Sequence, residues 1–195
     1  MARLYLVRHG RAAAGWDTAV DPPLDEVGVQ QAGSAAFTLL ERIESHTRSS
    51  EIEIVTSPLR RCQETAAAFV ALAGRPARVE PRIAEIPSPE GVAMGDRITW
   101  LRRAMQGTWA ELARNDGAVY EQFRARLVQW AGAVRRDTVA FSHFVAINAL
   151  IGAAQKDDRL VIRSLDNASI TTIEVEGDAS LTLIDGGNEA DTLIR

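Results

Sequence analysis

Two of the three histidines in this 195-residue chain follow short apolar runs, each with one residue in between. His9 comes after the run at residues 4–7, and His143 comes after the run at residues 138–141. Runs of this length, rich in β-branched and aromatic residues, are typical of buried β-strands. An imidazole can act as a nucleophile, a proton carrier or a metal ligand near neutral pH. The two histidines are therefore the first candidates for chemistry.

Two arginines occupy comparable places in the sequence. Arg8 directly precedes His9, and Arg61 falls in the first turn of a helix that we expect after a strand at residues 52–55. Because strand ends and helix N-termini converge at one edge of an open α/β sheet, these three side chains and that of His143 should meet there. Guanidinium groups bind phosphate oxygens through paired hydrogen bonds. The sequence therefore predicts an anion-binding site that holds a nucleophile.

Four short motifs carry a resemblance to a known family. They are RHG at residues 8–10, SPLRRCQETA at 57–66, RIAE at 82–85 and SHF at 142–144. In this order they resemble the phosphoglycerate-mutase-like group of the histidine phosphatase superfamily, over residues 1–172. One such motif is a weak signal, whereas four in order at predicted strand ends and helix starts are specific. The resemblance implies an α/β fold, a three-layer αβα sandwich with a central, mostly parallel sheet.

The resemblance also implies a role for each candidate residue. His9 would be the catalytic nucleophile, and its product would be a phosphohistidine that water then resolves. Arg8, Arg61 and His143 would bind the phosphoryl oxygens, and His143 would belong to the catalytic group as well. Glu85 would be the general acid that protonates the departing oxygen. A backbone carbonyl next to His9 would fix the tautomer of its ring.

The chain departs from the family pattern at three places. The loop at residues 86–91 is shorter than the usual version, which makes Glu90 a rival to Glu85 as the acid. Arg11 stands where the family often has an acidic or small residue, and Phe144 replaces a common glycine. Both are candidate substrate-binding residues: Arg11 for a second anionic group, and Phe144 for a ring or a narrower pocket. A solvated loop arginine and a core aromatic are the alternatives.

The composition restricts the classes of function. The chain is 46% hydrophobic and 25% charged, which is ordinary for a soluble globular protein, and we expect a single domain over residues 1–195. A net charge of -4 and an isoelectric point near 5.5 argue against nucleic-acid or anionic-membrane partners. The single cysteine and the lack of a signal-like start at residues 1–7 lead us to expect a cytoplasmic location.

Two other phosphatase chemistries do not fit the sequence. A cysteine phosphatase needs an arginine six positions after the nucleophile, and the residue six positions after Cys62 is Ala68. An aspartyl-phosphate mechanism needs an Asp-x-Asp pair after a strand, and none of the predicted strands has one. A metal hydrolase with His9, His143 and Glu85 as ligands is a further alternative, but two adjacent arginines would repel a divalent cation. We expect no metal and no other cofactor.

The sequence thus predicts a metal-independent phosphatase that hydrolyses phosphomonoesters through phospho-His9, acting on a small phosphorylated substrate or a phosphoprotein. The short chain and the short loop after Glu85 also suggest a phosphohistidine protein phosphatase. A non-catalytic phosphate-binding module is the alternative from another class. The presence of all five pocket residues disfavours that module, because a decayed site usually loses its nucleophile or its acid.

The remaining pattern predicts the elements that position the site. Helices are expected at 29–44, with Asp25 as N-cap, and at 62–73, 98–109, 117–136 and 145–154. A further strand is expected at 79–83, and a hairpin at 169–175 and 181–184. We expect His46 to be a solvated loop residue and the tail after residue 185 to be loose.

Overall fold

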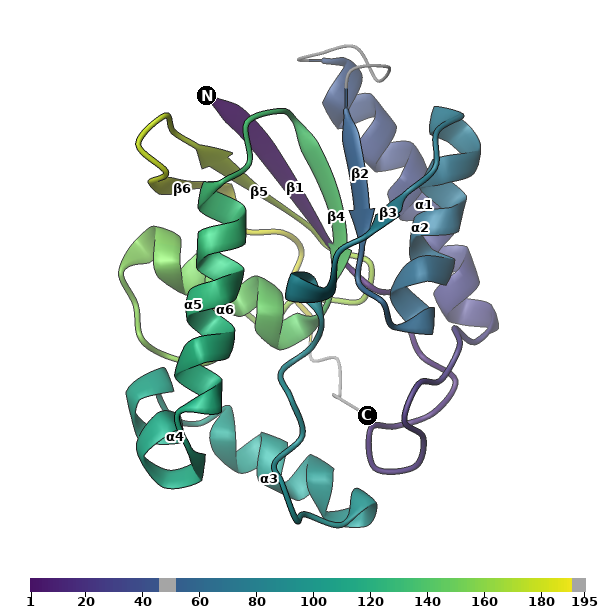
Figure 1. Ribbon diagram of the computed structural model, residues 1–195. Helices are drawn as coiled ribbons and strands as arrows, with labels where there is room; N and C mark the ends of the chain where they lie inside the picture. Colours follow the sequence, from purple (N-terminus) through teal and green to yellow (C-terminus); the bar gives the residue numbers. More distant parts are fainter. Residues whose placement is uncertain (46–51, 191–195) are drawn as a thin grey trace.

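The structure is a computed structural model that describes residues 1–45 and 52–190, in which the strands form one sheet in the order β3-β2-β4-β1-β5-β6 (Figure 1). β4 pairs in parallel with β1 and with β2, and β2 pairs in parallel with β3. β5 is antiparallel to both β1 and β6, so the predicted hairpin is confirmed. The strands are β1 (Ala2–Arg8), β2 (Glu53–Thr56), β3 (Arg78–Val79), β4 (Thr138–Ser142), β5 (Ile170–Val175) and β6 (Leu181–Asp185).

Helices cover both faces of the sheet. The α-helices are α1 (Glu26–Glu44), α2 (Arg60–Ala73), α3 (Arg97–Ala104), α4 (Trp109–Asp116), α5 (Val119–Gly132) and α6 (Phe144–Gln155), with short 3₁₀ turns η2 (Pro81–Ile83) and η3 (Met94–Asp96). α1 and α2 lie on one face, and α5 and α6 lie on the other (Figure 1). The three-layer α/β fold predicted from the sequence is therefore confirmed.

β1 is buried on both of its faces. Leu4 and Leu6 belong to the core formed with α5 and α6, whereas Tyr5 and Val7 belong to the core formed with α1 and α2. Successive side chains of a strand point to opposite faces, so a strand between two helical layers must be apolar throughout. This burial fixes the strand that presents Arg8 and His9 at its carboxyl end.

α1 starts at the N-cap that the sequence predicts. The Asp25 carboxylate accepts a hydrogen bond from the backbone N–H of Gly28 at 2.7 Å, although the helix begins three residues earlier than the pattern suggested, at Glu26. Gly28 lies directly against the backbone of Arg11, so a Cβ at this position would overlap the Arg11 carbonyl. The first turn of α1 therefore packs against the chain that leaves His9.

The strand predicted at residues 79–83 is mostly wrong. β3 covers only Arg78–Val79, and the chain then turns into η2. Pro81 has no N–H to donate to a sheet ladder, so the strand ends before it. The Glu80 side chain accepts a hydrogen bond from the backbone N–H of Arg82 at 3.2 Å and caps the turn instead.

The helix predicted at residues 98–109 ends at residue 104, α4 at residues 109–116 was not predicted, and α5 is shorter than the helix predicted at 117–136. α3 ends at Ala104 and α4 begins at Trp109 after a turn. Thr108 and Glu111 form a capping box: the Thr108 hydroxyl accepts from the Glu111 N–H at 3.2 Å, and the Glu111 carboxylate accepts from the Thr108 N–H at 2.9 Å. This Thr-x-x-Glu pattern was the sequence signal for a new helix start.

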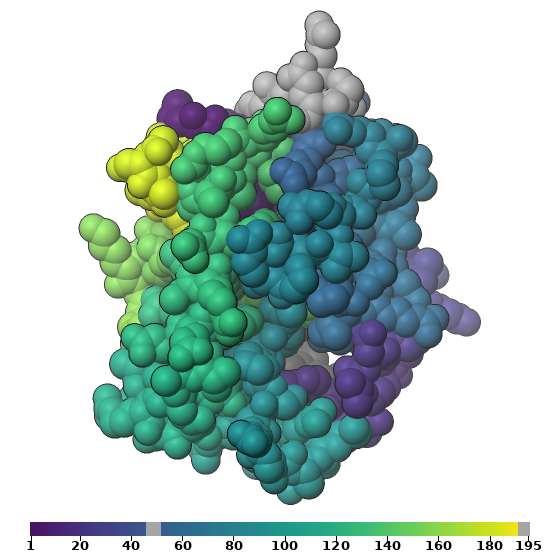
Figure 2. Space-filling model, in the orientation of Figure 1, coloured from purple at the N-terminus to yellow at the C-terminus, as the bar shows by residue number. Residues whose placement is uncertain are grey.

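α3 and the loop at residues 11–23 flank the carboxyl end of the sheet. Trp16 of the loop packs on Trp100 of α3 with ring centroids 6.1 Å apart, and Trp100 packs on Tyr120 of α5 at 5.5 Å. Figure 2 shows the surface hollowed between the teal segment that contains α3 and the purple loop. The two segments thus form opposite walls around the ends of the parallel strands.

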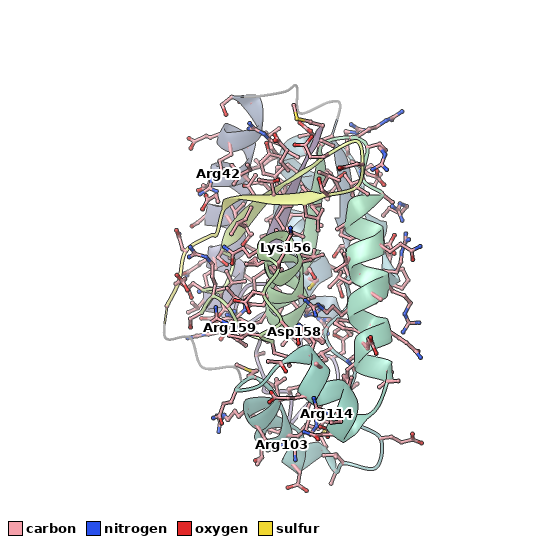
Figure 3. The ribbon with its side chains drawn as sticks, turned by 90° about the vertical axis from the view of Figure 1, so that its left-hand side faces the viewer. Arg42, Arg103, Arg114, Lys156, Asp158 and Arg159 are labelled. Atoms are coloured by element: carbon pink, nitrogen blue, oxygen red, sulfur yellow. The ribbon has the colours of Figure 1, made fainter. Side chains whose placement is uncertain are left out.

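Asp158 joins α4 to the chain that follows α6. Its carbonyl accepts from the Trp109 N–H at 2.9 Å, and its carboxylate accepts from the Ala110 N–H at 3.1 Å and pairs with Arg124 (Figure 3). These contacts hold α4 against the chain that follows α6, the helix whose N-cap is His143.

Residues 186–190, the described part of the tail after β6, are bound to the 164–171 segment, where the sequence suggested a loose end. Ser164 accepts from the Ala190 N–H at 3.0 Å, and the Glu189 carboxylate accepts from the Ser164 N–H at 2.9 Å. One contact is backbone to backbone and the other is made by a carboxylate, and both join segments far apart in the sequence, so the polar composition of the tail gave no sign of them. His46 lies outside the described residues. No helix in the described part of the chain has the length and hydrophobicity needed to cross a membrane.

Candidate active site

His9 is held by its own backbone at the carboxyl end of β1. Its N–H donates to the Ser142 carbonyl of β4 at 3.0 Å. Its carbonyl accepts from the Ala168 N–H at 3.3 Å and from the Asn167 side-chain amide at 3.2 Å. The residue is buried. The neighbouring parallel strand and the 166–169 loop therefore fix the position of the ring.

The hydrogen bonds of the His9 ring define its tautomer. Nδ1 lies 2.7 Å from the Gly10 carbonyl, which only accepts, so Nδ1 carries the hydrogen. Nε2 accepts a hydrogen bond from Nε of Arg61 at 3.1 Å. Burial, and then the charges of Arg61 and Arg8, lower the His9 pKa well below its usual value. His9 is thus a neutral imidazole with its lone pair on Nε2.

His143 is fully buried at the N-cap of α6, beside His9. The two ring centroids are 5.2 Å apart, and the rings are inclined at 64°. Nδ1 of His143 accepts from Nη2 of Arg61 at 3.1 Å, because a guanidinium has no acceptor atom. Nε2 then carries the hydrogen and donates to the Ser57 hydroxyl at 2.7 Å. Burial and the Arg61 charge lower the pKa of this imidazole as well.

Arg61 connects the two histidines from the first turn of α2. Its side chain is 7% exposed, and its Nη1 lies 3.9 Å from a carboxylate oxygen of Asp21 in the loop at residues 11–23. The neighbouring Arg60 side chain is 60% exposed and pairs with Glu64. Of the two adjacent arginines, only Arg61 points toward the histidines.

Arg8 is buried beside the histidines and its guanidinium is nearly unpaired. Nη1 donates to the Leu165 carbonyl, and the guanidinium lies 5.0 Å above the centre of the Phe144 ring. Nε is buried and has no hydrogen-bond partner among the described atoms. Burial lowers the Arg8 pKa to about 10, against the opposing effect of nearby Glu85. Arg8 is therefore a buried cation with donors free for an anion.

Glu85 lies at the same site, at the start of the segment that follows η2. Its carboxylate accepts from the Ile86 N–H at 2.9 Å and from the Val145 N–H of α6 at 3.5 Å. Burial raises its pKa, although Arg61 and Arg8 act in the opposite direction. Glu90 is exposed. The structure therefore brings Glu85 to the histidines.

The two candidate substrate-binding residues have different surroundings. Arg11 forms an ion pair with Asp25 at 2.6 Å and its side chain is 38% exposed. Phe144 is buried and its ring stacks under Arg8. Their contacts with a substrate remain predictions. Even without a substrate contact, Phe144 has a structural role, because its ring stabilises the Arg8 guanidinium that lies over its face.

Sequence reasoning missed several residues that hold the site. Ser57 bonds to His143, and Thr65 accepts from the Gly10 N–H at 3.0 Å while donating to the Arg61 carbonyl at 2.7 Å. Both lie within the SPLRRCQETA motif, so their polar side chains were a visible signal. Leu165 contributes only a carbonyl, which no sequence pattern marks.

The metal-hydrolase alternative gains no support from the side-chain arrangement. Within residues 1–45 and 52–190, no three His, Cys, Asp or Glu side chains are grouped in a way that could hold a metal ion. His9 and His143 each direct a ring nitrogen to Arg61 instead.

Comparison with known proteins agrees with this geometry. Residues 4–184 match the histidine phosphatase superfamily (branch 1). The chain belongs to this superfamily. No curated protein matches the chain.

Solved structures of phosphatases share its fold. A mycobacterial glucosyl-3-phosphoglycerate phosphatase complexed with VO3 has a TM-score of 0.72 and 24% identity, with 97% of this chain and 100% of that chain covered. A phosphoserine phosphatase from Entamoeba histolytica, in complex with 3-phosphoglyceric acid, has a TM-score of 0.72 and 19% identity, with 96% and 98% covered. At identities this low, the similarity shows a common fold.

Proposed function

We propose that the protein is a metal-independent phosphatase that hydrolyses phosphomonoesters through a phosphohistidine on His9. The observation that carries the proposal is the neutral His9 ring, with its lone pair on Nε2 and the Arg61 guanidinium against that nitrogen. A phosphate ester resists nucleophiles because its oxygens are negatively charged. Arg8 and Arg61 supply two buried positive charges where a phosphoryl group would meet Nε2.

In the first step, the phosphoryl oxygens would take hydrogen bonds from Arg8 and Arg61, with Arg61 turning its donors from the histidines to the substrate. Nε2 of His9 attacks phosphorus, a nitrogen–phosphorus bond forms, and the bond to the leaving oxygen breaks. Glu85 gives its proton to that oxygen. Its raised pKa favours the protonated acid that this step requires.

In the second step, water resolves the intermediate. The Glu85 carboxylate accepts a proton from water as the water oxygen attacks phosphorus, and the nitrogen–phosphorus bond breaks. Inorganic phosphate leaves, and both His9 and Glu85 return to their starting states. The hydrogen bond from Nδ1 to the Gly10 carbonyl stabilises the positive charge that develops on the ring in the phosphorylated form.

We propose a small phosphorylated compound as the substrate, with a phosphoprotein as the alternative. The two solved structures with the same fold are described as phosphatases of glucosyl-3-phosphoglycerate and of phosphoserine. Activity should be measured on a panel of phosphorylated metabolites, phosphoserine peptides and a phosphohistidine peptide. Selective hydrolysis of the phosphohistidine peptide would favour the protein phosphatase instead.

Trapping the intermediate tests the mechanism. Enzyme mixed with ³²P-labelled substrate and quenched in alkali should retain label that is stable in base and released by acid, as expected for phosphohistidine. His9→Ala should retain none while keeping the wild-type circular dichroism spectrum. Label of equal amount on His9→Ala would show that another residue is the nucleophile.

Independence from metals needs a separate measurement. Turnover should survive an excess of chelator, and vanadate should inhibit it, since a pentacoordinate oxyanion matches the arrangement of Arg8, Arg61 and His143. Loss of turnover in chelator that a divalent ion restores would favour a metal hydrolase.

A further inference from the structure

A groove lies on one face of the sheet, away from the histidines. It has a volume of about 290 Å³ and is lined by Glu53, Val55, Arg78, Arg82, Trp130, Ala133, Val134, Arg135, Arg136 and Thr138. Glu53 and Thr138 are the first residues of β2 and β4, whereas His9 follows the last residue of β1. The groove is therefore at the amino end of the parallel strands, and the candidate active site is at the carboxyl end.

The groove exists because the helical layer on this face is incomplete. α5 and α6 pack over the centre of the sheet, and over β2 the covering chain is η2 and its neighbours (Figure 1). Figure 2 shows the resulting hollow between the green end of α5 and the blue-teal surface around η2. Its volume is close to the lower end of the range of about 300–1,000 Å³ that is typical of small-molecule sites.

Four arginines line the groove, and two of them are neutralised by carboxylates. Arg78 pairs with Glu53 at 2.8 Å and with Glu80 at 3.2 Å, and Arg82 pairs with Glu80 at 2.7 Å. These arginines hold the pKa of the buried Glu80 carboxyl at about 2. Arg78 and Arg82 are therefore engaged in stabilising the buried Glu80 carboxylate, since a buried carboxylate without partners lowers the stability of the fold.

Within residues 1–45 and 52–190, the other two arginines, Arg135 and Arg136, have no carboxylate partner. Arg135 donates to the carbonyls of Gly132 at 2.6 Å and Val134 at 2.9 Å, which carry no net charge. Arg136 forms no ion pair with any carboxylate of the described residues within 4.0 Å. The groove thus holds two positive charges beyond those that its carboxylates balance, in a chain of net charge -4.

The groove also has apolar surface at one edge. Val55 and Trp130 are core residues buried beneath it, whereas Ala133 is exposed and Val134 is half-buried just after α5. We propose that this groove is a second ligand site, which binds a small organic anion with an apolar ring. A phosphate, sulfonate or carboxylate would take the donors of Arg135 and Arg136, and the ring would lie on Ala133 and Val134.

A matched pair of probes tests the proposal. 2-Naphthalenesulfonate carries one negative charge on an aromatic body, and 2-naphthalenesulfonamide is its neutral counterpart. Calorimetric titration with vanadate present keeps the catalytic pocket occupied. The sulfonate should bind at one site and the sulfonamide at least about fivefold more weakly, which is what roughly 1 kcal/mol of charge interaction at an exposed site gives. Equal affinity for both probes, or no binding of either, would overturn the proposal.

Two arginine variants locate the bound probe. Arg136→Ala should weaken sulfonate binding by about fivefold, and Arg136→Glu by more, because it reverses the charge. Arg126→Ala is the matched control: Arg126 is on the exposed surface of α5, bonds only the Gln122 carbonyl, and does not line the groove. Arg126→Ala should bind the sulfonate with the affinity of the wild type. Thermal melting verifies that all three variants are folded. An unchanged affinity in Arg136→Glu contradicts the assignment, as does competition between vanadate and the sulfonate.

Discussion

Arg61 donates from Nε to Nε2 of His9 at 3.1 Å, and through Nη2 it also reaches Nδ1 of His143 at 3.1 Å. One guanidinium thus bonds both imidazoles in the free site, and both ring nitrogens that face it must be unprotonated. Burial is the main reason why the pKa of each histidine is low, and the Arg61 charge lowers both further, since a protonated ring would repel it. Phosphate would compete for the same donors, so we expect Arg61 both to orient the two rings and to bind the substrate.

We expect Arg61→Lys to lower kcat/KM by on the order of a hundredfold or more, because an ammonium cannot reproduce the planar, bidentate donor set. Arg60→Lys is the matched control, since the Arg60 side chain is exposed and pairs with Glu64 at the surface. It should keep nearly full activity toward para-nitrophenyl phosphate. An equal loss in both variants would mean that the arginine pair acts through the stability of α2.

Glu85 and Glu90 can be distinguished by the leaving group. A general acid matters most when the departing oxygen is strongly basic, as in an alkyl ester, and little when it is para-nitrophenoxide. Glu85→Gln should slow alkyl esters more than aryl esters, by up to the 10²–10⁴-fold that is typical of such catalysis. Glu90→Gln should change both rates alike and slightly. A selective defect in Glu90→Gln would assign the acid to the exposed residue, and a selective defect in neither would favour a phosphohistidine substrate.

The sequence predicted that these side chains would meet because they follow the ends of strands, whereas their catalytic roles remain predictions. Apolar runs in the sequence located β1, β2 and β4. Because these strands are parallel, the residues that follow them lie at the same edge of the sheet. His9, His143 and Arg61 are therefore close together. The motifs then supplied the one residue that topology alone would not have found, Glu85, which no regular element marks.

The features that the sequence analysis missed have three separate physical causes. The strand expected at residues 79–83 has a suitable apolar pattern, but Pro81 cannot donate to a ladder and Glu80 caps η2 instead. The break between α3 and α4 depends on a capping box that competes with helical periodicity. The contact of Leu165 with Arg8 is made by a backbone carbonyl, and backbone contacts between distant segments depend on tertiary structure that composition does not record.

Acid should weaken the fold through the two buried imidazoles. Each has a folded-state pKa below the ordinary value, so the unfolded chain binds more protons once the pH falls below about 6.5. Stability is then lost as pH falls toward the folded pKa, by up to about 1.4 kcal/mol per pH unit for each histidine. The Glu80 contribution is lost only at lower pH, as the pH falls from its ordinary pKa of 4.5 toward about 2.

Urea denaturation between about pH 7.5 and 5.5 measures this dependence. His143→Asn removes one of the two titrating groups, so its free energy of unfolding should fall less steeply with acid than that of the wild type, whatever its stability at neutral pH. Slopes that are equal in the two proteins would show that His143 does not hold a lowered pKa.

The last prediction concerns two glycines on one helix. A Cβ added at Gly28 would overlap the backbone of Arg11, whereas a Cβ added at Gly33 would meet nothing within 4 Å. Gly33→Ala should therefore be neutral or stabilise the protein by up to about 1 kcal/mol, because alanine favours helix over glycine. Gly28→Ala should lower the free energy of unfolding by about 1–3 kcal/mol, the usual cost of overpacking. It should also reduce kcat/KM, since Arg11 lies two residues after His9 and the displaced chain includes the Gly10 carbonyl that fixes the ring. Chemical denaturation and steady-state kinetics on both variants check this, and if Gly28→Ala behaves like Gly33→Ala, the close packing of α1 on the nucleophile's loop does not contribute as described.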